Sequence, residues 1–389
     1  MEKNASKEKN QKDKTECEKC KQKSKIYNRN KFLCLDCFYE IINHKFRANL
    51  RTCCKIRHED YVLICISGGN SSMTMLHMFW KSFTQNKSNK KLFFKLKVLY
   101  VDDSLFLTEK NLIEEEKNKR KIFIDSLCKK YNFEYEIISL ENVMDLNNEN
   151  LKLDNGVKLD LINEYLNLYR QLPNKGGFKT RFIQITIRNL IFFYSIKYNF
   201  SKIFFGNNGQ SLVNDSFLSI IIGRGIDIRH DIDHLDDTYL NGKIHILKPC
   251  QDFFTKEIMY YFHYNKVEII YPIIKDEKTN VIVNNFFTKL QSEKLNSIPS
   301  VINTIEKLNL YKNDYKCLFC LSNNDKGNSV MEFGLDSELN NKECQLNLKL
   351  CYGCRRMFSN LIEDNIKNKN NDSIIDKILK YFQPLISIN

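Results

Sequence analysis

The stretch that decides the fold is 61–83, YVLICISGGNSSMTMLHMFWKSF. Residues Tyr61 to Ile66 form a continuous apolar run with the length of a buried strand, and apolar residues return at helical spacing from Met73 to Phe83. Between them, Ser67 to Ser72 holds two glycines and three serines, a composition typical of a tight turn. The stretch therefore predicts a strand, a loop and a helix in succession.

Similar units follow along the chain. Further strands are predicted at 96–101, 134–139, 202–205 and 244–249, and helices at 109–131, 180–198 and 255–265, with mostly helical chain at 281–308. The segment 141–179 is polar and lacks clear periodicity. This alternation predicts an α/β protein with a parallel sheet covered by helices. Ligands of such sheets bind at the carboxyl ends of the strands, where the loop 206–215 is expected.

The glycine-rich turn has the chemistry of a phosphate-binding loop. Glycines let the backbone approach a ligand closely, and converging N–H groups at a helix N-terminus attract an anion. A tight turn between a strand and a helix can use the same residues for purely structural reasons. The candidate nucleotide-binding residues are Ser67, Gly68, Gly69, Ser71 and Ser72.

Most of the fourteen cysteines occur in CxxC pairs. No secretory apolar segment precedes them, and the N-terminus does not resemble a transit peptide, so a cytoplasmic location with reduced thiols is predicted. A CxxC turn presents two thiolates to one metal ion. The two quartets are Cys17, Cys20, Cys34 and Cys37, and Cys317, Cys320, Cys351 and Cys354.

Each quartet is predicted to bind one structural zinc ion, because four thiolates complete a tetrahedral shell and leave no position for substrate. Thirteen residues separate the pairs of the first quartet, with a polar hairpin at 27–31, and thirty separate those of the second. Reduced thiols without metal are the alternative. Cys344 lies inside the second loop and could compete as a ligand, whereas Cys250 is interpreted as a small buried hydrophobe.

The positive net charge of the chain indicates which kinds of partner it could bind. Sixty Lys and Arg against 47 Asp and Glu leave +13, which favours a polyanion such as RNA or reflects a Lys-rich composition. A helix expected at 38–50 places basic residues on its polar side, which either contacts RNA or is simply solvated. These RNA-binding candidates are His44, Lys45, Arg47 and Arg51. The apolar stretch 182–205 contains three basic residues, so no membrane span is predicted.

The loop resembles that of the PP-loop ATP pyrophosphatases, which carry SGGxDS after the first strand. More narrowly, the chain is similar to the cytoplasmic tRNA 2-thiolation protein 2 family. The matching segments are Cys17-x-x-Cys20, Cys34-Leu-Asp-Cys-Phe38, His44-Lys-Phe-Arg47, Ser67-Gly-Gly-Asn-Ser-Ser72, Gly223-Arg-Gly225, 284–308 and Cys351-Tyr-Gly-Cys-Arg355. The resemblance implies a Rossmann-like parallel sheet of the PP-loop type, flanked by N- and C-terminal zinc-ribbon modules, and Arg224 as a further RNA-phosphate contact.

The expected division of the chain follows from these matches. It comprises a disordered basic tail at 1–16, a zinc ribbon with a basic helix at 17–58, a PP-loop-like domain at 59–275, a helical connection at 276–316, a C-terminal zinc module at 317–360 and a C-terminal helix or tail at 361–389.

Three departures from the active relatives stand out. Ser71 occupies the place of the loop's acid, Gly206 to Ser211 replaces a GHxxDD signature, and Pro173 to Arg181 lacks a cysteine pair. ATP activation needs groups that hold Mg²⁺, and sulfur transfer needs a thiolate. We therefore expect no catalytic residues, with retention of ATP binding left open.

Other acidic segments receive structural interpretations. Asp102, Asp103 and Asp215 are expected to be caps or turn formers. The His- and Asp-rich segment from His230 to Asp237 is interpreted as a polar turn, in preference to a metal site.

The resemblance implies a non-catalytic subunit that pairs with the catalytic thiolation subunit, protein 1 of the complex. Together they would 2-thiolate the wobble uridine of the tRNAs for Lys, Glu and Gln, with sulfur from a thiocarboxylated ubiquitin-related carrier. One alternative is a stand-alone ATP-dependent sulfurtransferase that adenylates tRNA. Another is a zinc-ribbon RNA-binding module with no role in thiolation.

Overall fold

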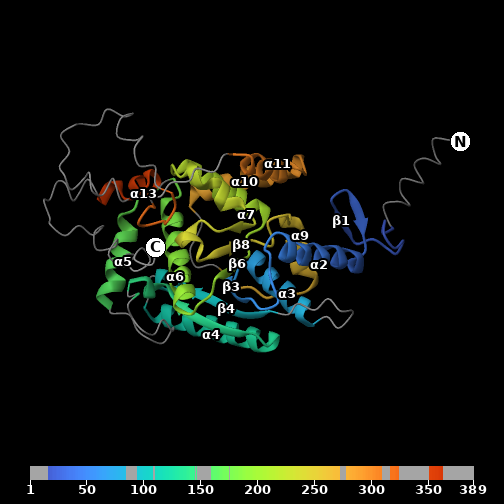
Figure 1. The fold of residues 1–389 in the computed structure, drawn as a ribbon, viewed down its shortest axis with the longest axis horizontal. Helices are drawn as coiled ribbons and strands as arrows, with labels where there is room; N and C mark the ends of the chain where they lie inside the picture. Colours follow the sequence, from blue (N-terminus) through green and yellow to red (C-terminus); the bar gives the residue numbers. More distant parts are fainter. Residues whose placement is uncertain are drawn as a thin grey trace.

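A six-stranded sheet runs through the centre of the protein (Figure 1). This computed structural model describes residues 16–84, 94–107, 110–144, 146, 159–174, 176–271, 277–308, 316–323 and 350–361. The strands are β3 (Tyr61–Ile66), β4 (Lys95–Asp102), β5 (Glu134–Ser139), β6 (Lys202–Phe205), β7 (Leu235–Asp236) and β8 (His245–Leu247). Their order is β5-β4-β3-β6-β8-β7, and all neighbours are parallel except β7 and β8. The predicted α/β class and parallel strands are confirmed.

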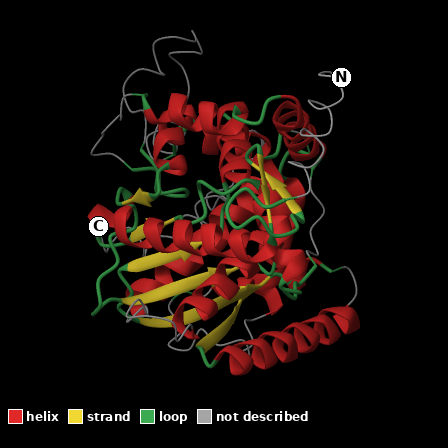
Figure 2. Cartoon of the chain, turned by 90° about the vertical axis from the view of Figure 1, so that its right-hand side faces the viewer, coloured by secondary structure: helices red, strands yellow, loops and turns green. Residues whose placement is uncertain are grey.

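Each face of the sheet is covered by its own helices (Figure 2). Because successive side chains of a strand point to opposite faces, Val62 and Ile64 enter one core and Leu63 and Cys65 the other. The first core includes α2 (Leu35–Thr52), α3 (Asn70–Thr84), α4 (Lys110–Tyr131) and α9 (Thr255–Tyr264). The second includes α5 (Leu159–Gln171) and α6 (Phe178–Lys197). Burial on both faces explains why β3 is apolar along nearly its whole length.

A separate group of helices packs around its own small core. It consists of α7 (Gly209–Ile221), α8 (Ile228–Ile232), α10 (Lys278–Glu293) and α11 (Ser297–Glu306). Short 3-10 helices occur at η1 (Ser104–Phe106), η2 (Leu140–Met144), η3 (Gly225–Asp227) and η4 (Tyr239–Gly242). Asn208 begins α7 by accepting a hydrogen bond from the backbone N–H of Ser211.

Three parts of the sequence fold differently from expectation. The expected loop 206–215 is helical from Gly209 onwards, where α7 begins. The segment without clear periodicity contains α5, whose Tyr165 and Leu168 are buried, as is Leu172 directly after the end of the helix. The His- and Asp-rich segment is not simply a turn, because it forms α8 and then the antiparallel edge strand β7.

Smaller elements carry the cysteines. The first quartet lies on a hairpin of β1 (Ile26–Asn28) and β2 (Lys31–Leu33), followed by α2. Arg29 and Asn30 turn this hairpin with positive φ values of 47° and 62°, as a two-residue turn requires. The second quartet lies on 316–323 and at the start of α13 (Tyr352–Met357). The expected tail before residue 16, Cys344 and the segment 362–389 lie outside the described residues.

No helix in the described ranges is both long enough and apolar enough to cross a bilayer.

Candidate functional site: two cysteine clusters and a cavity at the sheet edge

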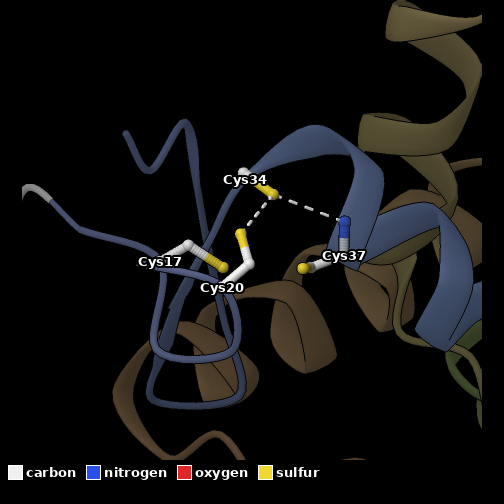
Figure 3. A group of neighbouring side chains, drawn as sticks. All are labelled: Cys17, Cys20, Cys34 and Cys37. Atoms are coloured by element: carbon white, nitrogen blue, oxygen red, sulfur yellow. Dashed lines mark hydrogen bonds between the residues drawn. The ribbon is translucent and has the colours of Figure 1, made fainter. Parts of the chain in front are cut away.

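The first quartet brings four sulfur atoms together within 4.8 Å of one another (Figure 3). Cys17 and Cys20 lie on a tight turn that closes through the Lys21 N–H and the Cys17 carbonyl at 2.8 Å. Cys34 is the N-cap of α2, and its Sγ accepts a hydrogen bond from the N–H of Cys37 at 3.4 Å. The Sγ atoms of Cys20 and Cys34 lie 3.5 Å apart. The quartet can therefore hold one metal ion.

The second quartet repeats this construction. Leu321, like Lys21, follows its CxxC pair with a positive φ, and its N–H reaches the Cys317 carbonyl at 2.9 Å. Cys351 is the N-cap of α13, and its Sγ lies 3.6 Å from that of Cys320. These four sulfur atoms also lie within 4.8 Å of one another. The clusters differ in exposure, because Cys20 is exposed and all four residues of the second quartet are buried.

The first cluster is attached to the α/β domain by polar contacts centred on Glu257. This carboxylate accepts hydrogen bonds from Arg29 at 2.7 and 3.1 Å and from Asn28 at 2.9 Å. It also accepts the Phe254 N–H at the start of α9, at 2.9 Å. Burial opposes its charge, but the Arg29 hydrogen bond and the nearby Lys45 hold the pKa of Glu257 below its ordinary value.

The second cluster is built into the core of the α/β domain. Phe319, between the cysteines, stacks on Phe182 of α6 with ring centroids 5.6 Å apart, and Phe358 packs edge-on against Phe182 at 6.3 Å. Asn189 donates to the Phe319 carbonyl at 2.7 Å, and Arg188 donates to the Cys320 carbonyl at 2.6 Å. This module therefore completes the same core that covers one face of the sheet.

Arg224 lies between the second cluster and the domain. It is 1% exposed, and its Nη2 donates to Ser322 Oγ. The neighbouring glycines explain how it fits: a Cβ at Gly353 would lie 2.5 Å from Arg224 Cγ, and one at Gly223 would lie 2.5 Å from the Tyr352 ring. The Gly-Arg-Gly segment is therefore interlocked with the last CxxC pair. Arg224 is therefore buried and does not reach the protein surface, where the sequence predicted a contact with an RNA phosphate.

The glycine-rich loop follows β3 as predicted, and its hydroxyl groups are engaged within the protein. Ser72 Oγ donates to the Gly69 carbonyl at 3.1 Å and lies 3.2 Å from Ser67 Oγ. Ser71 Oγ accepts from Asn208 Nδ2 at 3.0 Å.

Two other segments, around Ile270 and Gly206, pack closely against this loop. Gly68 has φ +80° and accepts the Ile270 N–H at 2.9 Å, and a Cβ at Gly68 would lie 2.6 Å from Ile270 Cβ. A Cβ at Gly206 would lie 2.4 Å from Ser72 Cα. Both glycines therefore allow close backbone packing, and Gly68 faces Ile270.

A cavity of about 530 Å³ opens beside the loop at the carboxyl ends of β3, β4 and β6. Its walls include Ser67 and Gly69 to Ser72 of the loop, together with apolar residues of α6. Charged side chains from several elements also line it: Asp103, Arg181, Arg188, Asp215, Asp231, Asp236 and Lys248. Sequence analysis named the four aspartates of this wall separately, but it did not bring them together with Arg181, Arg188 and Lys248, because these residues are far apart in the chain.

The charges in the cavity largely compensate one another. Arg181 pairs with Asp231 at 3.5 Å, and Lys248 donates to the carbonyls of His230, Asp231 and Asp233 at 2.8 to 3.0 Å. Burial raises the pKa of Asp215 to about 6, although Arg181 opposes the shift. Asp102 forms the expected turn by accepting from Ser104, whereas Asp103 instead pairs with Arg120 at 2.9 Å.

The basic candidates on α2 have different surroundings. His44 and Arg51 are exposed, and Arg47 is partly buried. Lys45 is turned inward, where it donates to the Asp252 carbonyl at 2.5 Å and lies over the Phe253 ring. Cys250 is fully buried, as expected for a small hydrophobe, and burial raises its pKa to about 12.

Comparison with known proteins adds relatives along most of the chain. No family model matches it. A Drosophila mojavensis protein named cytoplasmic tRNA 2-thiolation protein 2 is 24% identical over 388 residues, covering 89% of this chain and 91% of the relative. A Danio rerio protein of the same name is 24% identical over 363 residues, covering 78% and 71%.

A solved structure has a similar fold. The U34-tRNA thiolase NcsA from Methanococcus maripaludis, solved with its [4Fe-4S] cluster, aligns with a TM-score of 0.53 and 17% identity, over 76% of this chain and 90% of that one. The sheet and its loop thus define an α/β protein of the PP-loop type with a four-cysteine cluster towards each end. Within that class, the chain is similar along most of its length to proteins named cytoplasmic tRNA 2-thiolation protein 2.

Proposed function

We propose that this protein is a non-catalytic subunit of a cytoplasmic complex that 2-thiolates the wobble uridine of tRNA. The observation that carries the proposal is the state of the glycine-rich loop. Ser71 stands where active PP-loop enzymes have an acid, and its hydroxyl is held by Asn208. Such a loop keeps the shape of a nucleotide site without the carboxylate that would help to hold Mg²⁺.

The cavity supports the same conclusion. Among its described lining residues, Cys65 alone carries a thiol. Burial raises the pKa of Cys65, which keeps it protonated, and the thiolate is the reactive form. Sulfur transfer at this position is therefore disfavoured. The proposal assigns that step to the catalytic subunit, with sulfur from a thiocarboxylated ubiquitin-related carrier.

The remaining parts would hold the complex and its substrate. Both clusters have the all-thiolate donor set that zinc prefers, so we assign one structural zinc ion to each. The exposed basic residues of α2, His44 and Arg51, are candidates for contacts with the phosphates of the tRNAs for Lys, Glu and Gln. Arg47 stays a candidate beside them.

Reconstitution tests the proposal. The purified chain, the catalytic subunit and both together are incubated with unmodified tRNA, MgATP and the thiocarboxylated carrier, and thiouridine is measured by mass spectrometry of the nucleosides. We expect thiolation with both subunits and none with this chain alone. Robust thiolation by this chain alone would refute the proposal and favour the stand-alone enzyme.

Depletion in cells separates the remaining alternative. Loss of wobble thiouridine after depletion is expected, while unchanged thiouridine would favour an RNA-binding module outside the pathway.

Calorimetry with MgATP measures whether the cavity still binds a nucleotide. Gly68→Asp is the variant that should remove any such binding.

A further inference from the structure

The second cysteine cluster has a buried cation beside it. Arg224 is 1% exposed, and its Nε and Nη1 are buried without a hydrogen-bond partner. Around the first cluster the arrangement differs: Cys20 is exposed, and the nearby Lys19 is itself exposed and paired with Glu40 at 2.6 Å. A buried guanidinium with unused N–H groups is costly unless an anion compensates it.

The carboxylates of Asp227 and Asp231 act on Arg224 electrostatically, and the cluster itself would supply a further anion. Four thiolates around one divalent ion leave two net negative charges, and a buried anion is likewise costly without a nearby cation. Solvent can screen the first cluster through its exposed side, but the buried second cluster lacks that route. Two residues near the cysteines hold Arg224 in place: Ser322, which follows the first CxxC pair, and Gly353, which lies within the second.

A second arginine joins the cluster to the cavity. The two terminal nitrogens of Arg188 bind different groups. Nη2 donates to the Cys320 carbonyl of the cluster at 2.6 Å, and Nη1 donates to the Tyr239 hydroxyl in the cavity wall at 2.8 Å. Arg188 and Tyr239 both line the cavity. The backbone of a metal ligand thereby fixes a side chain in the cavity wall.

We propose that the second cluster binds its metal as an anionic thiolate centre balanced by Arg224, and that Arg188 links this centre to the cavity. The bound metal fixes the Cys317–Cys320 turn and thus the carbonyl that anchors Arg188. Loss of the metal frees that carbonyl and loosens the cavity wall beside Tyr239. The proposal depends on metal binding at the second cluster and is independent of the role in tRNA thiolation.

Site-resolved metal release tests the part played by Arg224. The full-length chain is exposed to increasing chelator and then to a thiol-alkylating reagent, and mass spectrometry reports alkylation of each quartet separately. In Arg224→Met we expect the second quartet to lose protection at about ten-fold lower chelator, a typical effect of losing a neighbour of the metal ligands. Arg224→Lys keeps the charge and should restore part of the protection, while the first quartet stays unchanged in both.

Arg29→Met is the matched control, because Arg29 contacts the attachment of the first cluster only. It should leave release from the second quartet unchanged. A folded Arg224→Met protein with unaltered protection of the second quartet would overturn the role of Arg224. Absence of metal from the second quartet of the purified chain would overturn the whole proposal.

The link through Arg188 is measured by hydrogen exchange. Chelation of wild-type protein should speed exchange at Arg188 to Phe192 and around Tyr239, relative to α3. In Arg188→Met, exchange at Tyr239 should already be fast with metal bound, and Arg188→Lys should partly slow it. Unchanged exchange at both segments after confirmed metal loss would overturn the link, and this result does not depend on the folding of any variant.

Discussion

Replacing Glu257 by Gln tests how the first cysteine module is held. The substitution keeps the size of the side chain but removes its charge and turns an amide N–H₂ towards the donors of Arg29 and Asn28. The carboxylate is 2% exposed, whereas the Arg29 side chain is 43% exposed. The partner left behind can therefore be partly hydrated.

The expected loss follows from these contacts. Hydrogen bonds to charged groups stabilise by about 1.5–3 kcal/mol. The exposure of Arg29 reduces this value, so we expect Glu257→Gln to lower the free energy of unfolding by about 2 kcal/mol. Glu257→Ala also removes the side-chain cap of α9, which adds about 1 kcal/mol.

Urea unfolding at neutral pH measures both variants, and Glu268→Gln is the control. Glu268 pairs with Lys130 at 3.2 Å, but the two side chains are 52% and 58% exposed, so its loss should cost less than about 0.5 kcal/mol. The folded-state pKa of Glu257 is lowered, so its contribution is present above the unfolded-state pKa and is lost as the pH falls through the folded-state value. The difference between wild type and Glu257→Gln should therefore shrink in acid. A loss as small as that of the control would refute the reasoning.

Three further changes have definite expected outcomes. Gly206→Ala should lower thermal stability, by about 1–3 kcal/mol in calorimetry, because its Cβ would meet Ser72 Cα at 2.4 Å. Gly353→Ala should displace Arg224 and release metal from the second quartet before the first, as alkylation under chelator would show. Asp215 has a folded-state pKa raised from 3.8 to about 6, so its stability contribution is present below pH 3.8 and lost as the pH rises through 6. Asp215→Asn should therefore become more stable relative to wild type between pH 4 and 7 in urea unfolding, and a flat difference would contradict the burial effect.

Local patterns were enough to predict the central strands and the loop. Strands β3, β5 and β6 begin and end at the predicted residues. Burial on both faces makes β3 apolar along nearly its whole length, whereas the edge strand β5 carries Glu134 and Glu136 and is buried only from Ile137 onwards. The CxxC spacing likewise predicted both clusters, since each pair is a short-range constraint on one turn. Helix α5 was missed because its buried residues lie inside a longer polar stretch.

Long-range contacts could not be predicted from one sequence. Arg224 was proposed as an RNA-phosphate contact, and its burial could not be predicted, because its environment is set by Gly353 and Ser322, about a hundred residues or more away. The charged cavity wall has the same origin, because Arg181, Asp231 and Lys248 come from different elements. Lys45 has the pattern of an exposed helix face, yet Asp252 and Glu257 draw it inward.

The place of the second cluster in the core has a consequence for biosynthesis. Phe182 of α6 is covered by Phe319 and Phe358, which are translated much later. At about 5–20 residues per second, the ribosome needs roughly 10–35 s to proceed from α6 to Phe358. During that interval the apolar side of α6 has no native cover from the C-terminal module. Nascent chains of this protein should therefore engage chaperones through α6, and release should coincide with arrival of the last CxxC pair.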